Sequence, residues 1–383
     1  MKLSHDILSI HKTITEAGYD LFVVGGAVRD SLLRKNPEDV DLVTNALPET
    51  VMELLADYNL DLQGKSFGVV RVFTKYYPKG IEIATYRKDI TAGRNPEVNF
   101  RDVTIEEDAN RRDFTINALY YNITESKTLD FVNGISDLEN KIIMTPGNPL
   151  DRFNEDGLRV MRAFRFAGRI DGDLHPEVQI AILKKNPKLE SILDNGEKVL
   201  ISQERVWEEF TKALTQVHSP WDYVMSLVQH NIIQEVFPGF VKTGSIVMDS
   251  RKPEFVVAAL MLGRFSEAVS ASGRKILTKY LVQKCLLSSK QAQGVVLLMR
   301  ALAHDANDVN EMYKVLTRTN LKMEDVSLFV SEIGDKNFGR ALGQYKPSID
   351  STTLNLEGEA LGIEIKKLET DLFLKLLENE NSK

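Results

Sequence analysis

The sequence predicts two kinds of structure along one chain of 383 residues, a mixed α/β portion followed by a portion made of helices. In the first part, short apolar or alternating runs are separated by turns and helical segments, as in an α/β domain. After residue 150 the strand pattern stops and apolar residues recur every three to four positions, which indicates amphipathic helices. The chain is longer than one compact core usually supports, so more than one domain is expected.

The first part contains six candidate strands: LFVVG (21–25), DVDLV (39–43), GVVRVFT (68–74), IEIAT (81–85), ALYYNI (118–123) and TLDFV (128–132). The last two are joined by TESK and form a predicted hairpin. In the second part, helical spacing runs through segments such as HPEVQIAILKKN, SQERVWEEFTKALTQV and PWDYVMSLVQHNIIQEV.

Composition excludes several classes of protein. The net charge of -7 argues against a basic coat that binds nucleic acid indiscriminately, although a local basic surface remains possible. The apolar runs are too short to span a membrane and the amino terminus lacks a signal-peptide pattern, so we expect a cytoplasmic protein with no membrane partner. Cys285 is the single cysteine, so it has no intramolecular disulfide partner.

Two acidic residues, Asp39 and Asp41, stand two positions apart in DVDLVT. On a strand both carboxylates would project from one face, while Val40 and Leu42 would face a core. Carboxylates this close repel each other unless cations lie between them, and their hard oxygen atoms suit Mg²⁺. The pair is a candidate metal site for phosphoryl transfer, but taken alone it also fits two acids exposed to water.

Glu82 lies between two isoleucines in IEIAT, so on a neighbouring strand it would be the one carboxylate on the polar face. It is the candidate third acid of the site. The exposed face of a half-buried strand would explain Glu82 equally well.

GGAVRD follows an apolar strand and opens a helix. Gly25 and Gly26 permit close backbone approach, and the N–H groups of a helix start together with Arg29 suit a phosphate. A tight turn between strand and helix needs no ligand, so it remains the alternative.

Together these blocks resemble a known family. GGAVRD followed by DVDLVT is similar to the opening signature of the class II tRNA nucleotidyltransferases and bacterial poly(A) polymerases, within the DNA polymerase beta superfamily. The resemblance continues through RRDFTINALYYN (111–122), DFVNGISDL (130–138), EDGLRVMRAFRFA (155–167) and QERVWEE (203–209). It implies an α/β nucleotidyltransferase head with a mixed sheet, followed by an all-helical neck, body and tail.

The resemblance also implies roles for individual residues. Asp39 and Asp41 would bind Mg²⁺, with Glu82 as the third catalytic carboxylate. The residues implied to hold the triphosphate and ribose are Gly25, Gly26, Arg29, Arg112, Asp113 and Asn117.

EDGLR offers a way to choose a base. In a helix, Asp156 and Arg159 would be neighbours on one face. Asp accepts and Arg donates hydrogen bonds, which matches the amino group and ring nitrogen of cytosine or adenine, whereas uracil and guanine invert the pattern. The resemblance implies that this pair, supported by Glu155, selects CTP and ATP. A surface ion pair is the alternative.

Arg162 and Arg165 continue the same predicted helix. One interpretation is a cationic wall that faces the triphosphate and the RNA 3′ end. The other is a set of salt bridges that anchor the helix.

The predicted function is addition of CCA to the 3′ end of tRNA from CTP and ATP, with release of pyrophosphate. GKSFGVVRVF stands where the poly(A) polymerase branch carries a GRRFR-like block, which favours CCA addition. The alternatives are a poly(A) polymerase, an enzyme adding only CC or only A, and a non-catalytic RNA-binding protein of this fold. Expected domains are a head (1–145), a nucleotide-selecting neck (146–215), a body (216–300) and a tRNA-binding tail (301–383).

Overall fold

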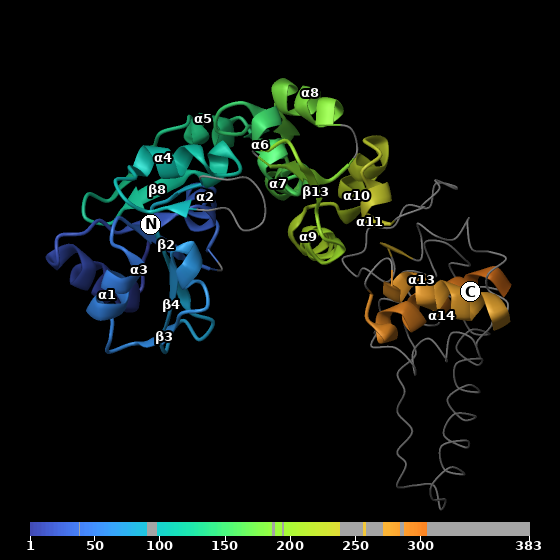
Figure 1. Cartoon of the computed structure of the whole chain (residues 1–383), viewed down its shortest axis with the longest axis horizontal. Coiled ribbons are helices and arrows are strands. Elements are labelled where there is room, and N and C mark those ends of the chain that lie inside the picture. Colours follow the sequence, from blue (N-terminus) through green and yellow to red (C-terminus); the bar gives the residue numbers. More distant parts are fainter. Residues whose placement is uncertain are drawn as a thin grey trace, which may run out of the picture. The chain divides into compact units, whose positions relative to one another are not determined.

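The computed structural model describes residues 1–37, 39–89, 98–185, 188–193, 195–237, 256–257, 271–283 and 287–304. The chain forms two compact units, residues 1–201 and 202–383 (Figure 1). The finer division into head, neck, body and tail stays a prediction, and nearly all of the expected tail lies outside the described residues.

The first unit is built on a seven-stranded sheet with the order β3-β4-β5-β2-β1-β8-β9. Strands β2 and β5 are parallel and the other neighbours are antiparallel, so the predicted mixed sheet is confirmed. The strands are β1 (Phe22–Val24), β2 (Asp41–Thr44), β3 (Asn59–Asp61), β4 (Val69–Phe73), β5 (Ile81–Thr85), β8 (Leu119–Asn122) and β9 (Lys127–Asp130). Six of them match the predicted runs, and β3 was not predicted. A separate pair joins β6 (Lys88–Asp89) and β7 (Val98–Asn99).

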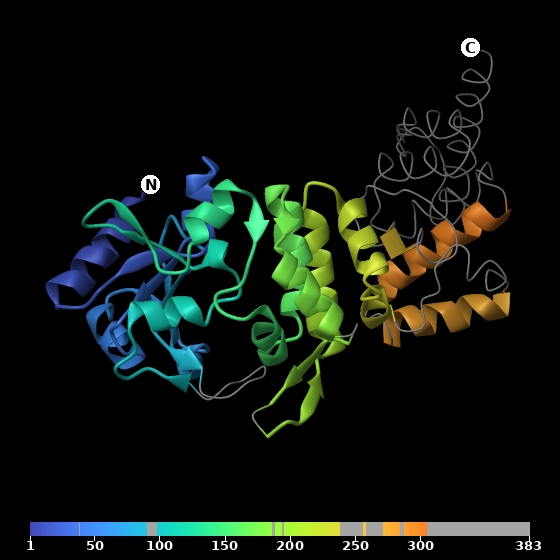
Figure 2. The same cartoon turned by 90° about the horizontal axis from the view of Figure 1, so that it is seen from above.

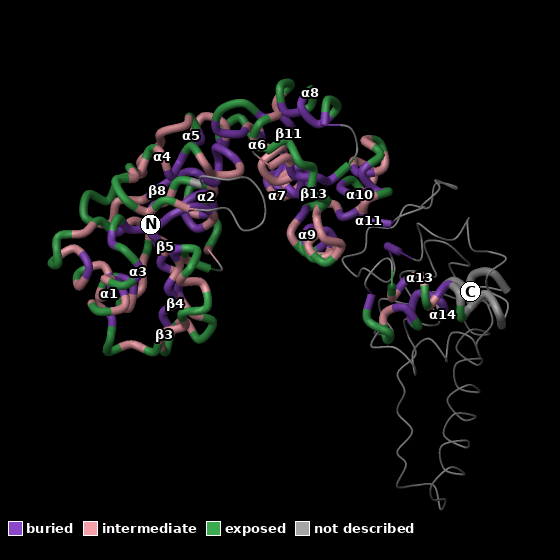
Figure 3. The backbone as a smooth tube through the Cα atoms, in the orientation of Figure 1, coloured by how far each residue is buried: buried purple, intermediate pink, exposed green. Residues whose placement is uncertain are grey.

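Alternation within the strands separates a buried face from a polar one. On β4 and β5, Val70, Val72 and Ile83 are at most 1% exposed, whereas Arg71 and Glu82 point to the other face. Strand β2 lies inside the sheet, and its residues 42–44 are all buried, as the purple tube shows in Figure 3. One face of the sheet is therefore apolar. The opposite face carries charged side chains from β4, β5 and β2.

Helices surround this sheet: α1 (His5–Glu16), α2 (Gly26–Leu32), α3 (Pro48–Leu54), α4 (Ile105–Asn110) and α5 (Gly134–Glu139), with 3₁₀ turns η1 (Lys65–Phe67) and η2 (Thr115–Asn117). Helix α1 buries Ile7, Ile10 and Ile14, a spacing that places them on one helical face. Helix α4 begins with a capping box, in which Thr104 and Glu107 each bond the other's backbone N–H.

The rest of the first unit contains α6 (Pro149–Glu155), α7 (Arg159–Ile170) and α8 (Pro176–Lys185). It also contains β10 (Ile142–Ile143) paired with β11 (Asp173–Leu174), and the hairpin β12 (Glu190–Ile192) with β13 (Lys198–Leu200), which projects from the helices in Figure 2. The predicted all-helical neck thus includes short strands. Asn195 and Gly196, with φ of +79° at the glycine, form a turn of the Asn-Gly type that favours a hairpin.

The described part of the second unit is helical, as predicted: α9 (Gln203–Gln216), α10 (Pro220–Gln229), α11 (Ile233–Val236), α13 (Ala271–Gln283) and α14 (Ser289–His304). Phe210 is fully buried and contacts the rings of Trp207, Tyr223 and Phe237 at centroid distances of 5.4–6.2 Å. Across the described segments, no helix combines the length and apolar character needed to cross a membrane.

Candidate nucleotide-binding and metal site

The three predicted carboxylates lie near the edge of the sheet that is formed by the first residues of β2 and β5 and the last residue of β1. Val24, at the end of β1, is opposite Asp41, and Leu42 pairs with Ile83 on the parallel strand β5. One residue earlier in each strand, Asp41 therefore lies beside Glu82 on the same face. Tertiary pairing thus brings the two acids, 41 and 82, onto neighbouring strands.

Asp39 is not on the strand that the sequence predicted. Strand β2 begins at Asp41, and Asp39 lies in a bend before it. The physical reason is that β1 ends at Val24, opposite Asp41, so the residues before Asp41 have no β1 residue opposite them. Asp39 and Asp41 are both exposed, which leaves their carboxylates at the surface of this edge.

The donor chemistry of Asp39, Asp41 and Glu82 fits a hard divalent cation, since all three offer carboxylate oxygen atoms. Within the segments that the structure describes, no three His, Cys, Asp or Glu side chains are grouped closely enough to hold a metal ion. Glu82 instead accepts a hydrogen bond from Arg71 Nη2, with 2.5 Å between Nη2 and Oε1. The third candidate carboxylate, Glu82, is therefore paired with Arg71 in this structure.

The glycine turn joins β1 to α2 at the same edge. Gly25 has a φ of +71°, a conformation that favours glycine, and its N–H donates to the carbonyl of Leu119 at 3.0 Å. A Cβ at Gly25 would lie 3.6 Å from the Asn117 carbonyl oxygen and 3.7 Å from Arg112 Nη1. The fold therefore places Gly25, Arg112 and Asn117, three residues of the predicted nucleotide site, in direct proximity.

Arg29 is inside the protein, not at its surface. Its side chain donates to Asp30 Oδ1 at 2.8 and 2.9 Å and to Asn117 Oδ1 at 2.5 Å, and the residue is 2% exposed. Burial lowers the pKa of Arg29, although Asp30 opposes that effect. In this structure Arg29 braces the Asn117 side chain, and a direct contact with a triphosphate stays a prediction.

Asp113 connects the glycine turn to helix α7. It accepts a hydrogen bond from Asn117 Nδ2 at 3.1 Å and from Arg162 Nε at 3.0 Å. Burial alone would raise the pKa of Asp113, but the charge and hydrogen bonds of Arg162, aided by Asn117, lower it to about 2. The carboxylate therefore stays ionised and holds Asn117 and Arg162 in fixed positions.

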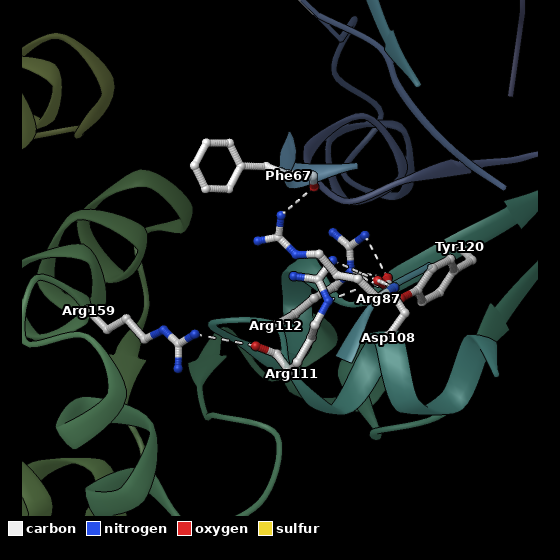
Figure 4. A network of polar contacts seen from close by, with 7 residues as sticks. All are labelled: Phe67, Arg87, Asp108, Arg111, Arg112, Tyr120 and Arg159. Atoms are coloured by element: carbon white, nitrogen blue, oxygen red, sulfur yellow. Dashed lines mark hydrogen bonds and ion pairs between the residues drawn. The ribbon is translucent and has the colours of Figure 1, made fainter. Parts of the chain in front are cut away.

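A second network is centred on Asp108, which the sequence interpretation missed (Figure 4). Asp108 is fully buried and accepts hydrogen bonds from Arg111, Arg112 and the Tyr120 hydroxyl. Burial would raise its pKa, but the two guanidinium groups and the hydroxyl lower it to about 2. The spacing of Asp108 from Arg111 and Arg112, three and four residues, was a usable signal for these pairs.

Arg87 extends this network towards the turn η1. Its Nη1 donates to the Phe67 carbonyl oxygen at 2.8 Å, and its backbone N–H donates to Asp108 Oδ1 at 3.4 Å (Figure 4). The GKSFG segment is thus linked to the arginines of RRD through one side chain.

The prediction that EDGLR is helical throughout is wrong. Helix α6 ends at Glu155, Asp156 has extended backbone angles of φ -146° and ψ 105°, and α7 begins at Arg159. Asp156 Oδ1 accepts from the backbone N–H of Leu158 at 3.1 Å. Asp-Gly is a turn signal, and here it interrupts the helix because the aspartate bonds the backbone.

Gly157 has a packing role at this break. A Cβ there would lie 2.6 Å from both the backbone N and O of Glu190 in β12. The hairpin therefore packs directly on the junction that presents Asp156 and Arg159.

Arg159 reaches from α7 to the RRD block. Its Nη1 donates to Glu155 Oε2 at 2.7 Å and to the Arg152 carbonyl at 3.1 Å. Its Nη2 donates to the Arg111 carbonyl at 3.3 Å, as Figure 4 shows. The bond joins Glu155 to Arg159, and a supporting role of Glu155 in base selection stays a prediction. These bonds use three of the five N–H donors of a guanidinium group.

The other arginines of α7 mostly anchor the helix. Arg162 pairs with Asp113, and Arg169 Nη2 pairs with Asp30 Oδ2 at 2.8 Å. Arg165 is 2% exposed, with its guanidinium carbon 4.3 Å from the centroid of the Phe166 ring. The salt-bridge interpretation is therefore realised for Arg162 and Arg169, and nucleotide contacts by Arg162 and Arg165 stay predictions.

Comparison with known proteins agrees with this arrangement. Residues 21–144 match the poly A polymerase head domain. The chain is 35% identical over 263 residues to poly(A) polymerase I of Salmonella typhimurium, covering 64% of this chain and 54% of that protein. It is 36% identical over 252 residues to the CCA-adding enzyme of Bacillus subtilis, covering 65% of this chain and 59% of that enzyme. The alignments thus span little more than half of these relatives.

Solved structures show the same fold. The CCA-adding enzyme of Bacillus stearothermophilus in complex with CTP superposes with a TM-score of 0.64 at 22% identity, covering 100% of this chain and 99% of that one. The CCA-adding enzyme of Thermotoga maritima complexed with tRNA superposes with a TM-score of 0.62 at 19% identity, covering 99% and 96% of the two chains. The family resemblance and the fold class predicted from the sequence are confirmed. Residues 21–144 are a poly A polymerase head domain, in a chain related to the bacterial CCA-adding enzymes and poly(A) polymerases.

Proposed function

We propose that the chain is a template-independent nucleotidyltransferase that adds CCA to the 3′ end of tRNA from CTP and ATP in the cytoplasm. The observation that carries the proposal is the position of Arg159. Its contact with the Arg111 carbonyl places the base-selecting block beside the RRD block, and Arg112 of that block lies at the Gly25 turn. Elements that could choose a base and hold its phosphates are therefore adjacent in the first unit.

Base choice rests on the protein's own hydrogen-bonding groups. The Asp156 carboxylate would accept from the amino group of cytosine or adenine, and the Arg159 guanidinium would donate to the adjacent ring nitrogen. Uracil or guanine would set a carbonyl against the carboxylate and a ring N–H against the guanidinium. Each unpaired buried group costs about 1–3 kcal/mol, which is enough to reject the wrong base.

Catalysis in this proposal is chiefly positioning. The tRNA 3′-hydroxyl attacks the α-phosphorus of the nucleotide, the new phosphodiester bond forms, and pyrophosphate leaves. Asn117 and Arg112, held by Arg29, Asp113 and Asp108, would orient ribose and phosphates. Asp39, Asp41 and Glu82 would hold Mg²⁺, which when bound would neutralise phosphate charge and activate the hydroxyl.

The choice of CCA addition over polyadenylation is supported by Gly68. The GRRFR-like block of the poly(A) polymerase branch would place an arginine at this position. Here Gly68 has a φ of +78°, and a Cβ would lie 2.3 Å from Phe100 Cε1. Lys65, the remaining cation of the segment, pairs with Glu49 at 3.0 Å. The segment therefore lacks the arginines of that block, and a side chain at Gly68 would require both a strained backbone and displacement of the Phe100 ring.

The test is an incorporation assay with purified protein and Mg²⁺. The substrates are tRNAs that end before the first C, after CC and after CCA, each with one nucleotide or with CTP and ATP together. We expect two C residues, one A and then termination. Long A tails on an unrelated RNA would identify a poly(A) polymerase, arrest after CC would identify a partial enzyme, and no incorporation would favour an RNA-binding protein.

The metal assignment is tested by Asp41→Asn and Asp39→Asn. We expect each variant to lose at least about a thousandfold in transfer rate while tRNA binding changes little, because loss of electrostatic stabilisation at the reacting phosphate is costly. Asp57→Asn, a change at an exposed acid of the same unit, is the matched control. Turnover close to that of the unaltered protein would remove these acids from the metal site.

A further inference from the structure

Four charged residues form one row across the sheet on the face that carries Asp41. Asp61 on β3 pairs with Arg71 on β4, and Arg71 pairs with Glu82 on β5. Asp41 follows in the row, since Leu42 pairs with Ile83 on β5. Residues paired across neighbouring strands point to the same face, so the order of side-chain charges is negative, positive, negative, negative.

Arg71 is bound unequally by its two neighbours in this row. The distance from Nη2 to Glu82 Oε1 is 2.5 Å, a hydrogen-bonded ion pair, whereas the distance from Nη1 to Asp61 Oδ2 is 3.8 Å. The guanidinium thus has one strong acceptor and a second acceptor that is within reach but not hydrogen-bonded.

The stem of Arg71 is held in place while its charged end is partly in solvent. Gly80 has a φ of +88°, and a Cβ there would lie 2.4 Å from Arg71 Cγ and 2.6 Å from Cδ. The side chains of Arg71 and Glu82 are 41% and 44% exposed. A fixed stem with an accessible guanidinium allows the group to exchange partners between Glu82 and Asp61 without movement of the strands.

We propose that Arg71 is an internal counter-ion for the metal site: it holds Glu82 when no divalent cation is bound and transfers to Asp61 when Glu82 turns to the metal. This inference rests on the proposed function, in which Glu82 is the third carboxylate. Arg71 and a divalent cation compete for Glu82, because both are attracted to the same carboxylate and their like charges repel. Arg71 is thereby a positioning residue that sets metal affinity.

The competition predicts opposite effects of two substitutions on binding of Mn²⁺ alone. Arg71→Gln removes the competing cation, so the dissociation constant of Mn²⁺ should fall by about two- to fivefold, the effect of a weak, half-exposed ion pair. Asp61→Asn removes the alternative acceptor, so Arg71 stays on Glu82 and the dissociation constant should rise by a similar factor. In the double variant the effect of Asp61→Asn should disappear, because Asp61 acts through Arg71.

The experiment is a titration of the full chain with Mn²⁺, monitored by the electron paramagnetic resonance signal of free Mn²⁺. Lys75→Gln removes an exposed positive charge from the turn after β4 and is the control for net charge. Thermal unfolding of each variant checks that the fold is retained.

The outcomes distinguish failure of the proposed metal site from failure of the counter-ion role of Arg71. If Asp41→Asn leaves Mn²⁺ binding unchanged, the metal site and hence the proposed function are wrong. If Asp41→Asn abolishes binding but Arg71→Gln matches Lys75→Gln, the metal site stands and the counter-ion role of Arg71 is overturned. An effect of Asp61→Asn that persists in the Arg71→Gln background would also overturn it, since Asp61 would then act by charge alone.

Discussion

Asp108 is a buried carboxylate that holds two guanidinium groups and one hydroxyl at fixed positions. Such a group cannot be exchanged for a neutral one without leaving cations unpaired. At the residue scale, the candidate site thus depends on acids that hold other side chains in place. Asp113 has the same character, since it links Asn117 to Arg162.

Asp108→Asn should lower the free energy of unfolding by about 3–5 kcal/mol at pH 7, the usual cost of removing one partner of a buried ion pair. The pKa of Asp108 is lowered to about 2 in the folded protein. Ionisation of the Asp108 carboxylate therefore contributes about 2 kcal/mol to the free energy of unfolding. This pH-dependent contribution is complete above the unfolded pKa near 4 and is lost as the pH falls towards 2. The unfolding free energy of the Asp108→Asn variant should therefore decrease less steeply over that pH range than that of the unaltered protein.

Urea unfolding followed by circular dichroism at pH 7, 4 and 3 measures both effects. Asp102→Asn is the matched control, since Asp102 is exposed on the segment before α4. Equal unfolding free energies and equal pH profiles for the two variants would show that the Asp108 network contributes no stability.

Asp156→Ala and Arg159→Ala should weaken discrimination against UTP and GTP. Loss of one hydrogen-bonding group that a bound base would bury corresponds to about 1–3 kcal/mol, so the ratio of kcat/KM for CTP over UTP should fall by about 5- to 150-fold. Asp151→Asn, an exposed position on α6, is the control. Nucleotide preference identical to that of the control would contradict selection by the protein.

At the scale of elements, helix α7 is tied to the preceding α/β part of the chain by two ion pairs and one hydrogen bond, with partners in the RRD block and in α2. Arg159 reaches the Arg111 carbonyl, Arg162 pairs with Asp113, and Arg169 pairs with Asp30 of α2. The helix begins at the break after Gly157, whose backbone packs on β12. The orientation of EDGLR is therefore set by contacts along α7, because the block itself is only a short turn.

A double-mutant cycle of Asp30→Asn and Arg169→Gln should show a coupling energy of about 1–3 kcal/mol in urea unfolding. The side chains of this pair are only 9% and 23% exposed, so water screens them weakly. Lys141 and Asp171 form a pair with 53% and 74% exposed side chains, and their cycle should give less than about 0.5 kcal/mol. Equal coupling in both cycles would show that Arg169 does not fasten α7.

At the scale of the whole molecule, the first unit contains every residue proposed to bind nucleotide or metal. The acidic balance of the chain, with a net charge of -7, means that RNA affinity must come from local cations and shape. We expect residues 202–383 to contribute tRNA binding.

Residues 1–201, purified alone, should fold and bind CTP with an affinity close to that of the full chain. Their affinity for tRNA should fall by at least about tenfold, a loss of 1.4 kcal/mol or more, because the helical contacts are missing. Circular dichroism and fluorescence titration with labelled tRNA measure these properties, and the full chain is the reference. Undiminished tRNA affinity would refute a tRNA-binding role for the second unit.

Sequence patterns predicted six strands of the sheet, since alternation in runs such as VVRVF and IEIAT follows from a half-buried strand. They failed at β3 and at the pairs β6–β7, β10–β11 and β12–β13, because two or three residues carry too few positions for a period to show. Strand β1 is equally short, but the longer apolar run LFVVG marked it. At EDGLR, helical spacing on both sides outweighed the Asp-Gly turn signal.

Local sequence by itself determined which residues are candidates for the chemistry: the acids at 39, 41 and 82, the glycine turn, and EDGLR. Only the tertiary structure decided which side chains these residues contact. It turned Arg29 inward onto Asn117, and it set Arg71 against Glu82. The physical reason is that chemical type and period are written in consecutive residues, whereas an ion pair depends on which strands become neighbours and which side chains are removed from water.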